Sequence, residues 1–399
     1  MNYAKQYQAR LRRFVLAVML ILAACSITLS AQTFSEIYQF TDLYSYTSLT
    51  NTLAIDAAGR LYGTIPYGQP QTCAWDGEVF QLRQAGTGWI LNPLYCFQGG
   101  DDGYEPYDYG GLKFGSDGAL YGTTAGGGTS GVCSGGCGTV FRLGPPPNPC
   151  HTATCSWKLT TAYDFGPGGN SATPTGGVIF NSTGSMFGTA VSAFELTSSN
   201  GNWIYSSLYI LQNGPYPVAS LVMDRDGNLY GTNANAGSYG EVFQLTRAET
   251  GWVKTTLHTF INGQDGGSPI AGLAVDQDGN LYGATIHGGQ NFGGVVYELS
   301  HSGGGWEFNA IYSLSGNGGP WSGLTLDDAG NLYGATCFDG HYQLGNVFEL
   351  SPGQNGWIYS DLHSFSEADH ASCPIAGVTV APDGTLYGTA SDIVWKIAR

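Results

Sequence analysis

The chain has 399 residues, among them 62 Gly, 25 Tyr, 18 Phe and 9 Trp, and 11% of its residues are charged. A chain of this length can bury a large core, and its aromatic content excludes intrinsic disorder despite the glycine. The formal charge of −16 repels phosphate backbones, so we expect no nucleic-acid partner. Strongly anionic polysaccharides are disfavoured for the same reason, unless a cation bridges them.

Residues 1–31 have the pattern of a secretory signal peptide. An apolar run from Phe14 to Ala24 follows a segment that carries four basic residues, Lys5, Arg10, Arg12 and Arg13. The run is shorter than the roughly 20 residues that a transmembrane helix needs. No later stretch of the sequence is apolar enough to span a membrane. We therefore expect an exported protein, secreted or held at the cell surface.

The end of this segment leaves two processing routes open. The tetrapeptide LAAC at residues 22–25 resembles a lipobox, in which Cys25 would be lipidated. Ordinary cleavage near Ala31 would remove Cys25 instead. Because the apolar character continues through Ile27 and Leu29, we favour simple secretion. Residues 1–31 hold four of the 14 basic residues and none of the 30 acidic ones, so the remaining chain carries a formal charge near −20.

A six-residue motif recurs seven times along the rest of the chain. The aromatic residues of successive copies are 59, 66, 43, 52, 51 and 54 residues apart. A repeat of this period indicates one repeated architecture rather than a string of unrelated domains. The copies are 59-GRLYGT-64, 118-GALYGT-123, 184-GSMFGT-189, 227-GNLYGT-232, 278-DGNLYGAT-285, 330-GNLYGA-335 and 384-GTLYGT-389.

The fifth unit shows what each repeat builds. Short runs rich in β-branched and aromatic residues, joined by turns and a glycine-rich loop, are typical of an antiparallel meander. Such a four-stranded unit of about 50 residues fits one blade of a β-propeller. The expected strands are 272–276, 281–285, 295–299 and 306–314, with a turn at 277–280 and a loop at 287–293.

The two ends of the chain complete each other. The seventh unit stops after its third strand, at residues 393–397, close to Arg399. Residues 37–40 match the fourth strand of the sixth unit, at residues 362–365. An N-terminal strand that completes the last blade would remove the free edges of the ring. We therefore expect residues 32–399 to form a single all-β domain, a seven-bladed β-propeller with four-stranded blades.

The motif itself has a structural explanation. Gly279 suits the left-handed position of a tight turn, and Gly283 leaves a strand position without a side chain, which would allow a neighbouring sheet to approach. Asp276 and Asp278 could suggest calcium, but the third acid and the Glu of an EF-hand loop are missing. We favour the turn and expect no metal ion and no cofactor.

These residues resemble a known family. The DGNLYGT core, the glycine-rich loop and the following GxVF-L pattern are similar to the GloVer tandem-repeat proteins, which are exported bacterial proteins. The resemblance covers nearly all of the chain after residue 31, and it implies a propeller-like repeat protein outside the cytoplasm. The turn followed by LYG also resembles exported NHL and lyase-type propellers, at the level of the fold only.

An even number of cysteines after residue 31 indicates disulfides in an exported chain. In a propeller, the loops between second and third strands lie on one face with the links between blades, and cysteines in these segments can meet. A redox or metal site is the alternative for Cys133 and Cys137, but the pair lacks C-x-x-C spacing and a nearby His. The expected pairs are Cys73–Cys96, Cys133–Cys137, Cys150–Cys155 and Cys337–Cys373.

The face with these longer loops is the better candidate for a binding site. Residues that follow the proline of each link should surround the mouth of the central channel. Aromatic rings beside carboxylates suit sugars, although the same rings could simply plug the channel or cover the loops. The candidate ligand-binding residues are Trp75, Asp101, Asp102, Tyr107, His287, Trp321, His341 and His370, and Ile270 and Ile375 also follow link prolines.

An enzymatic site is the alternative. Motifs for serine hydrolases, zinc proteases or nucleotide binding are absent from the sequence. His341 or His370 could act as the base of a polysaccharide lyase, and Asp102 with Glu105 could serve as acid and base in a glycoside hydrolase. His258 and His363 recur at one position of the fourth strand, which indicates that histidine also has a structural use here.

Taken together, these patterns favour a monomeric, non-catalytic binding module that recognises a carbohydrate or a cell-surface protein. A polysaccharide lyase or glycoside hydrolase that uses the same face is the second hypothesis. A structural envelope protein without a small ligand is the third.

Overall fold

The computed structural model describes residues 32–40, 49, 51–67, 73, 76–106, 111–129, 131, 133, 135–147, 156–166, 173–174, 176–211, 219–234, 236–316 and 318–399. The chain divides into two units, Met1–Thr33 with Arg399, and Phe34–Ala398. The second unit carries all seven sheets. The expected signal peptide, including Cys25, lies outside the described residues.

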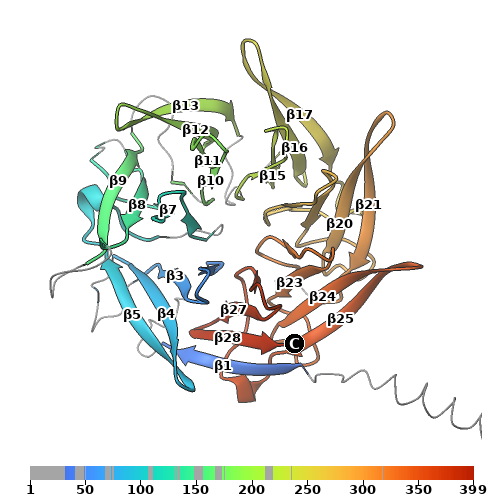
Figure 1. The fold of residues 1–399 in the computed structure, drawn as a ribbon. Helices are drawn as coiled ribbons and strands as arrows, with labels where there is room; N and C mark the ends of the chain where they lie inside the picture. Colours follow the sequence, from blue (N-terminus) through green and yellow to red (C-terminus); the bar gives the residue numbers. More distant parts are fainter. Residues whose placement is uncertain are drawn as a thin grey trace, which may run out of the picture. The chain divides into compact units, whose positions relative to one another are not determined.

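Seven four-stranded antiparallel sheets form the blades of a β-propeller (Figure 1). The predicted fold class is therefore confirmed. Blade 1 contains β2 (Ala54–Ile55), β3 (Leu61–Ile65), β4 (Glu78–Ala85) and β5 (Gly88–Cys96); blade 2 contains β6 (Lys113–Phe114), β7 (Leu120–Thr124), β8 (Thr139–Gly144) and β9 (Lys158–Asp164); blade 3 contains β10 (Ile179–Phe180), β11 (Met186–Thr189), β12 (Ser192–Ser199) and β13 (Asn202–Ile210). Blade 4 contains β14 (Val222–Met223), β15 (Leu229–Asn233), β16 (Glu241–Ala248) and β17 (Gly251–Thr259); blade 5 contains β18 (Ala274–Val275), β19 (Leu281–Ala284), β20 (Val295–Ser302) and β21 (Gly305–Ser313); blade 6 contains β22 (Thr325–Leu326), β23 (Leu332–Thr336), β24 (Asn346–Gly353) and β25 (Gly356–Ser364).

The last blade joins the two ends of the propeller. It contains β26 (Thr379–Val380), β27 (Leu386–Ala390), β28 (Ile393–Ala398) and, as its outermost strand, β1 (Thr33–Gln39). The backbone N–H of Phe40 donates to the carbonyl of Asp392 at 2.9 Å, and that of Leu49 donates to Ser391 at 2.9 Å. The expected closure by the N-terminal strand is confirmed, and it leaves no unpaired β28 edge in this blade.

The innermost strands are shorter than the sequence suggested. In blade 5 the first strand is only Ala274–Val275, whereas residues 272–276 were expected. Asp276 already belongs to the turn, because its carbonyl accepts the N–H of Gly279 at 3.3 Å. The predicted left-handed backbone of Gly279 is confirmed, with φ of 88°.

The glycine of each motif makes room within its own blade, not for a neighbouring sheet as expected. Gly63 pairs directly with Phe80 on the next strand, and a Cβ on Gly63 would collide with that ring and with Leu53. Because the ring lies over the glycine, Phe80 is 1% exposed, and burial of such a ring contributes about 1.5–3 kcal/mol. Tyr297 and Trp395 occupy the equivalent position opposite Gly283 and Gly388.

Neighbouring blades pack through the other two repeated aromatic positions. In blades 1, 2, 4, 5 and 6, the tryptophan near the start of the fourth strand meets the motif aromatic of the preceding blade, edge to face, with ring centroids 5.7–6.1 Å apart. This geometry is favourable for aromatic pairs. The pairs are Trp89 with Tyr387, Trp157 with Tyr62, Trp252 with Phe187, Trp306 with Tyr230 and Trp357 with Tyr282.

Three of the four expected disulfides are formed: Cys73–Cys96, Cys133–Cys137 and Cys337–Cys373. While Cys133 and Cys137 are bonded to each other, neither thiolate is available as a metal ligand. The expected pair of Cys150 and Cys155 lies outside the described residues.

The antiparallel order of the strands gives the propeller two distinct ends. We call the end with the loops between second and third strands and the links between blades the link face. We call the other end, with the turns between first and second and between third and fourth strands, the turn face. Within the described part of the chain, no helix has the length and apolar character to cross a membrane.

Candidate functional site on the link face

A central pocket of about 170 Å³ opens among the innermost strands. It lies at the link end of these strands, because Ile270 and Trp321 line it and each directly follows a link proline. These two predicted channel residues therefore do surround the pocket. The lining also includes Thr52, Ser220, Leu273 and Ser322, together with one charged residue, Lys113.

Two polar atoms on adjacent residues of the pocket lining have no hydrogen-bond partner among the described residues. They are the indole Nε1 of Trp321 and the hydroxyl of Ser322, and both atoms are shielded from solvent. A buried polar group without a partner costs about 1–3 kcal/mol. Such groups are rare in native proteins, and each one calls for an explanation.

The link face of blades 4 to 6 exposes four large aromatic side chains. The exposed fractions are 77% for Phe292, 57% for Tyr342, 47% for Phe338 and 41% for Tyr239. All four belong to loops between second and third strands. We call these residues the aromatic arc. Phe292 also has a φ of 61°, which is a strained backbone conformation for a bulky side chain.

One residue of the aromatic arc lies close to one residue of the pocket lining. A side chain on Gly318 would lie 3.6 Å from the ring of Phe338 and 4.0 Å from Nε1 of Trp321. Phe338 and Trp321 therefore flank the same glycine of the link between blades 5 and 6.

The predicted histidines lie on the link face, but the structure does not gather them into one group. His287, His341 and His370 are all exposed. Among the described residues, no hydrogen bond or ion pair involves any of their side chains. The ring of His341 lies beside that of Tyr342, with centroids 4.7 Å apart. His370 ends the 3-10 turn η2 (Glu367–Asp369) in the left-handed conformation.

In the acidic link between blades 1 and 2, the carboxylate of Asp102 accepts hydrogen bonds within the fold, whereas Asp101 is exposed. Asp102 closes the 3-10 turn η1 (Gly100–Asp102), accepting hydrogen bonds from the hydroxyl of Tyr95 at 2.7 Å and the N–H of Gln98 at 3.0 Å. Asp101 is exposed, and its carbonyl accepts the hydroxyl of Thr161 at 2.9 Å. Asp102 thus has a structural use that the sequence did not reveal.

The sequence suggested Asp102 as the acidic partner of Glu105, but in the structure the acidic neighbour of Glu105 is Asp76. Its backbone N–H donates to the carbonyl of Asp76 at 2.9 Å. Burial, and next the negative charge of Asp76, raise the pKa of the Glu105 carboxyl above its usual value. Glu105 is therefore more easily protonated than an ordinary glutamate.

Two histidines at the end of the fourth strand hold link residues in place, as expected from their recurrence. His258 lies 3.2 Å from the carboxylate of Asp265 and stacks on Phe308. His363 stacks on Phe34 with centroids 3.6 Å apart, and its Nε2 lies 3.4 Å from Asp369 without hydrogen-bond geometry. Burial lowers the pKa of His363 despite Asp369, so its ring is a packing group at neutral pH.

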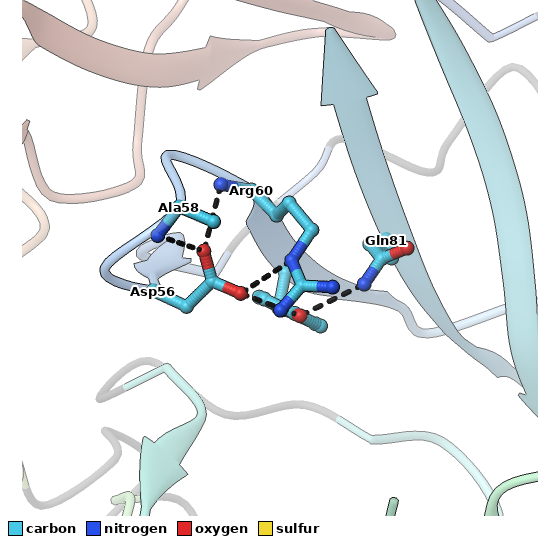
Figure 2. A network of polar contacts seen from close by, with 5 residues as sticks. Asp56, Ala58, Arg60 and Gln81 are labelled. Carbon is cyan, nitrogen blue, oxygen red and sulfur yellow. Dashed lines mark hydrogen bonds and ion pairs between the residues drawn. The ribbon is translucent and has the colours of Figure 1, made fainter. Parts of the chain in front are cut away.

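The motif aspartates on the turn face accept hydrogen bonds from the backbone of their own turns. Asp56 accepts the N–H groups of Ala58 and Arg60 at 2.9 Å and the Arg60 guanidinium at 2.6 Å, while Gln81 donates to the Tyr62 hydroxyl (Figure 2). Asp276 likewise accepts the N–H groups of Asp278 and Asn280. These bonds support the turn interpretation of the Asp-x-Asp-Gly sequence.

A second hollow lies on this turn face. It has a volume of about 650 Å³ and is lined by Asp224, Asp276 and Asp327 together with exposed Asp278 and Asp328. Three of these carboxylates already accept hydrogen bonds from their own turns. In the described part of the chain, no group of three or more potential metal ligands comes together.

Sequence reasoning missed the aromatic arc. The signal was present, since Trp75, Tyr239, Phe292 and Tyr342 all stand within three residues of the glycine that precedes a third strand. The expected ligand residues Trp75 and Tyr107 lie outside the described residues. Whether Trp75 extends the arc into blade 1 therefore stays a prediction from the repeat alone.

The fold, the disulfides and this loop-built face define the class: a β-propeller repeat protein with features consistent with an extracytoplasmic location. The chain belongs to the Gloeobacter/Verrucomicrobia repeat family, whose sequence model matches residues 190–394. No curated protein matches the sequence.

Solved propellers share the fold at low sequence identity. A streptogramin B lyase has a TM-score of 0.59 and 14% identity, covering 92% of this chain and 97% of that one. The extracellular domain of a putative one-component system from B. thetaiotaomicron has a TM-score of 0.55 and 10% identity, covering 93% of this chain and 40% of that one. The WD40 propeller domain of Doa1 has a TM-score of 0.55 and 11% identity, covering 92% and 97%. At these identities the likeness establishes the fold alone.

Proposed function

We propose that this protein is a non-catalytic binding module that recognises carbohydrate through the link face of blades 4 to 6. The observation that carries the proposal is the exposure of the aromatic arc, Tyr239, Phe292, Phe338 and Tyr342. Large exposed apolar side chains on one face of a protein often mark an interaction site.

The arc has no evident structural use. Phe292 keeps a left-handed backbone, which costs of the order of 1–3 kcal/mol for a residue other than glycine, while its ring remains 77% exposed. A phenylalanine that is both strained and exposed gains nothing from the fold, and a ligand would supply the missing contact. The rings suit the C–H faces of sugars, and the hydroxyls of Tyr239 and Tyr342 add hydrogen-bonding groups.

The charge of the protein narrows the type of glycan. The formal charge of −16 opposes the approach of polyanions, so a neutral polysaccharide is the expected ligand. A cell-surface protein is the other partner that such an apolar patch could bind, and the experiment below separates the two.

The test is a thermal-shift screen of the purified, oxidised protein against neutral and acidic polysaccharides, with and without calcium. We expect a rise in Tm with a neutral glycan, lost in the variants Phe292→Ala and Tyr342→Ala. Ile358→Ala is the matched control, because this side chain is 58% exposed on the outermost strand β25. An absence of shift with every glycan would refute carbohydrate binding and favour a protein partner or a structural envelope role.

A second candidate function, glycoside hydrolysis, is favoured by one observation. The raised pKa of Glu105 beside Asp76 is a feature that catalytic acids share. Incubation with the same polysaccharides and detection of new reducing ends would test this. Glu105→Gln should abolish any cleavage, whereas Glu249→Gln, at an exposed site on the turn face, should not. Intact polysaccharide after prolonged incubation would remove this candidate.

Export is part of the proposal. The disulfides and the extracellular propeller domains of similar fold support a location outside the cytoplasm. We propose simple secretion after cleavage near Ala31. Mass spectrometry of the exported protein would show an N-terminus near residue 32, whereas a lipid-modified Cys25 would establish the lipoprotein route instead.

A further inference from the structure

We propose that this protein forms a two-fold symmetric dimer in which the outermost strand of blade 3, β13, pairs antiparallel with β13 of a second copy. The inference is independent of the proposed carbohydrate binding, because it concerns the outer edge of a blade and not the link face. It differs from the monomer that the sequence alone favoured.

β13 has a free edge. Blade 3 has the strand order β10-β11-β12-β13, so β13 is outermost and pairs only with β12 among the described residues (Figure 1). The strand has nine residues, Asn202–Ile210, and spans about 30 Å at the usual rise per residue. Such an edge presents a row of backbone N–H and C=O groups that can pair with another strand.

β13 lacks the residues that protect the other outermost strands from pairing. Native proteins blunt sheet edges with charged side chains and with proline. All seven outermost strands are described, and six of them carry a charge or a proline, whereas β13, with the sequence NWIYSSLYI, carries neither. The protecting residues include Glu36 in β1, Pro93 in β5, Lys158 in β9, Lys254 in β17, Glu307 in β21 and Asp361 in β25.

The same strand exposes apolar side chains near both of its ends. The exposed fractions are 52% for Ile204, 38% for Tyr209 and 70% for Ile210. Other blades share an exposed aliphatic residue at the position of Ile204, but their fourth strands end in polar residues or cysteine and not in isoleucine. In an antiparallel pair, Ile204 of one copy lies towards the end that carries Ile210 of the other. Each copy would therefore cover apolar surface of its partner.

The absence of charge points to a second copy as the partner. A different protein can match a charged edge with the opposite charge, so it does not require a neutral strand. An identical strand brings the same residues to both sides, and like charges opposite each other destabilise a strand pair. Self-pairing of β21 or β25 would bring two copies of Glu307 or of Asp361 into one ladder. β13 avoids this repulsion, and it also has no proline that removes an N–H.

The number of copies and the effect of salt follow from the same features. Each copy has one such unprotected edge, so an isologous pair is closed at two copies. The formal charge of −16 makes the copies repel each other at long range. Salt shortens the Debye length from about 10 Å at 0.1 M to about 3 Å at 1 M. Pairing through an uncharged strand should therefore strengthen with salt, whereas an association held by ion pairs would weaken.

Sedimentation velocity of the purified, oxidised protein would test the dimer. We expect a species of twice the monomer mass, whose fraction rises with protein concentration and with salt. Ser206→Lys adds a charge at an exposed position in the middle of β13 and should return the protein to the monomer mass. Ser360→Lys is the matched control in β25, because Ser206 pairs with Glu195 as Ser360 pairs with Glu349, and both serines are exposed.

A second variant interrupts the edge without adding a charge. Ser207→Pro copies Pro93 of blade 1, since Ser207 pairs with Phe194 as Pro93 pairs with Phe80. Blade 1 shows that proline at this place is compatible with the ladder inside a blade, while the missing N–H weakens pairing across the free edge. We expect this variant to be monomeric as well. A circular dichroism spectrum equal to that of wild type would show that each variant has lost the dimer and not the fold.

Four results would overturn the proposal. The first is a monomer at every protein and salt concentration, which would leave the edge of β13 to a strand of another protein. The second is a dimer that both Ser206→Lys and Ser207→Pro leave intact. The third is a dimer that Ser360→Lys dissociates as fully as Ser206→Lys does. The fourth is an association that weakens as the salt concentration rises.

Discussion

The hydroxyl of Tyr333 donates a hydrogen bond of 2.9 Å to the carboxylate of Asp327, at the start of the turn that precedes its strand. The same carboxylate accepts the N–H groups of Ala329 and Asn331 and the side-chain amide of Asn331. One aspartate thereby fixes the turn and ties it to the second strand. Blades 1, 4 and 5 repeat the arrangement with Asp56, Asp224 and Asp276.

Removing this carboxylate should destabilise the propeller. Asp327→Ala leaves several donors without their acceptor, and we expect a loss of about 1–3 kcal/mol in the free energy of unfolding. Urea denaturation followed by tryptophan fluorescence would measure it. Asp328→Ala, at the exposed neighbouring position, is the control and should be close to neutral.

Blade 3 supplies a natural substitute for this network. There Asn181 accepts the N–H groups of Thr183 and Ser185, and the motif aromatic is Phe187, which has no hydroxyl to satisfy. The triple variant D327N/N331S/Y333F copies this solution into blade 6. It should lose less stability than Asp327→Ala, and a larger loss would show that the blade 3 arrangement depends on its surroundings.

Acid should weaken the propeller through the motif aspartates. Burial by itself would raise the pKa values of Asp56, Asp117 and Asp327, but hydrogen bonds from backbone N–H groups, Arg, Asn and Tyr side chains hold them below the usual value. A carboxyl with a lowered pKa stabilises the fold above its unfolded pKa of about 3.9. That stability is lost as the pH falls from there through the lower folded pKa.

Urea midpoints at pH 7, 4, 3 and 2 would measure this dependence. We expect little change between pH 7 and about 5, where aspartate is ionised both folded and unfolded, and a decline below about pH 4. Replacement of Asp327 by Asn should flatten part of the decline. A midpoint at pH 2 equal to that at pH 7 would contradict the prediction.

Tyr297 carries a hydroxyl that the fold does not use. The residue is fully buried, its oxygen has no hydrogen-bond partner among the described residues, and burial raises the pKa of the phenol. Most other blades have phenylalanine at this position, for example Phe243 and Phe348. Tyr297→Phe should therefore raise stability by about 1 kcal/mol, measured as an increase in Tm. A decrease would mean that the hydroxyl has a partner, such as an internal water.

The disulfides should differ in their contribution to stability. Cys337–Cys373 closes a loop with a sequence separation of 36 residues and Cys133–Cys137 one of 4. On the chain-entropy estimate these loops correspond to about 4 and 2 kcal/mol. The paired serine variants C337S/C373S and C133S/C137S, compared by thermal denaturation, should keep this order. The reverse order would show that strain or residual structure outweighs loop length.

The propeller and its closure could be predicted because they depend on local patterns. Each strand alternates its faces, each turn between first and second strands has its own glycine, and residues 37–40 matched the missing fourth strand. The disulfides followed from which loops share a face. What the repeat could not reveal was the contact partner of its glycine, because Phe80 meets Gly63 only through the register of two strands.

The candidate site was harder to predict for a physical reason. Trp321 was predicted at the mouth of the channel because it follows a link proline, and it does line the central pocket. The exposure of Phe292 could not be predicted from the sequence, because a phenylalanine in a glycine-rich loop can equally be buried in the channel or exposed to solvent. The hydrogen bond from Tyr95 to Asp102 could not be predicted either, because it depends on a 3-10 turn that has no recognisable sequence signature.

The sequence by itself determined the repeat, the number of blades, the chain ends that meet and three of the cysteine pairs, because these follow from short-range periodicity and from the geometry of antiparallel strands. Only the tertiary structure decided which side chains lack partners. Whether the Ser322 hydroxyl is satisfied, or the ring of Phe292 covered, depends on neighbours brought together from distant blades, and solvent exposure is a property of that packing and not of the residue.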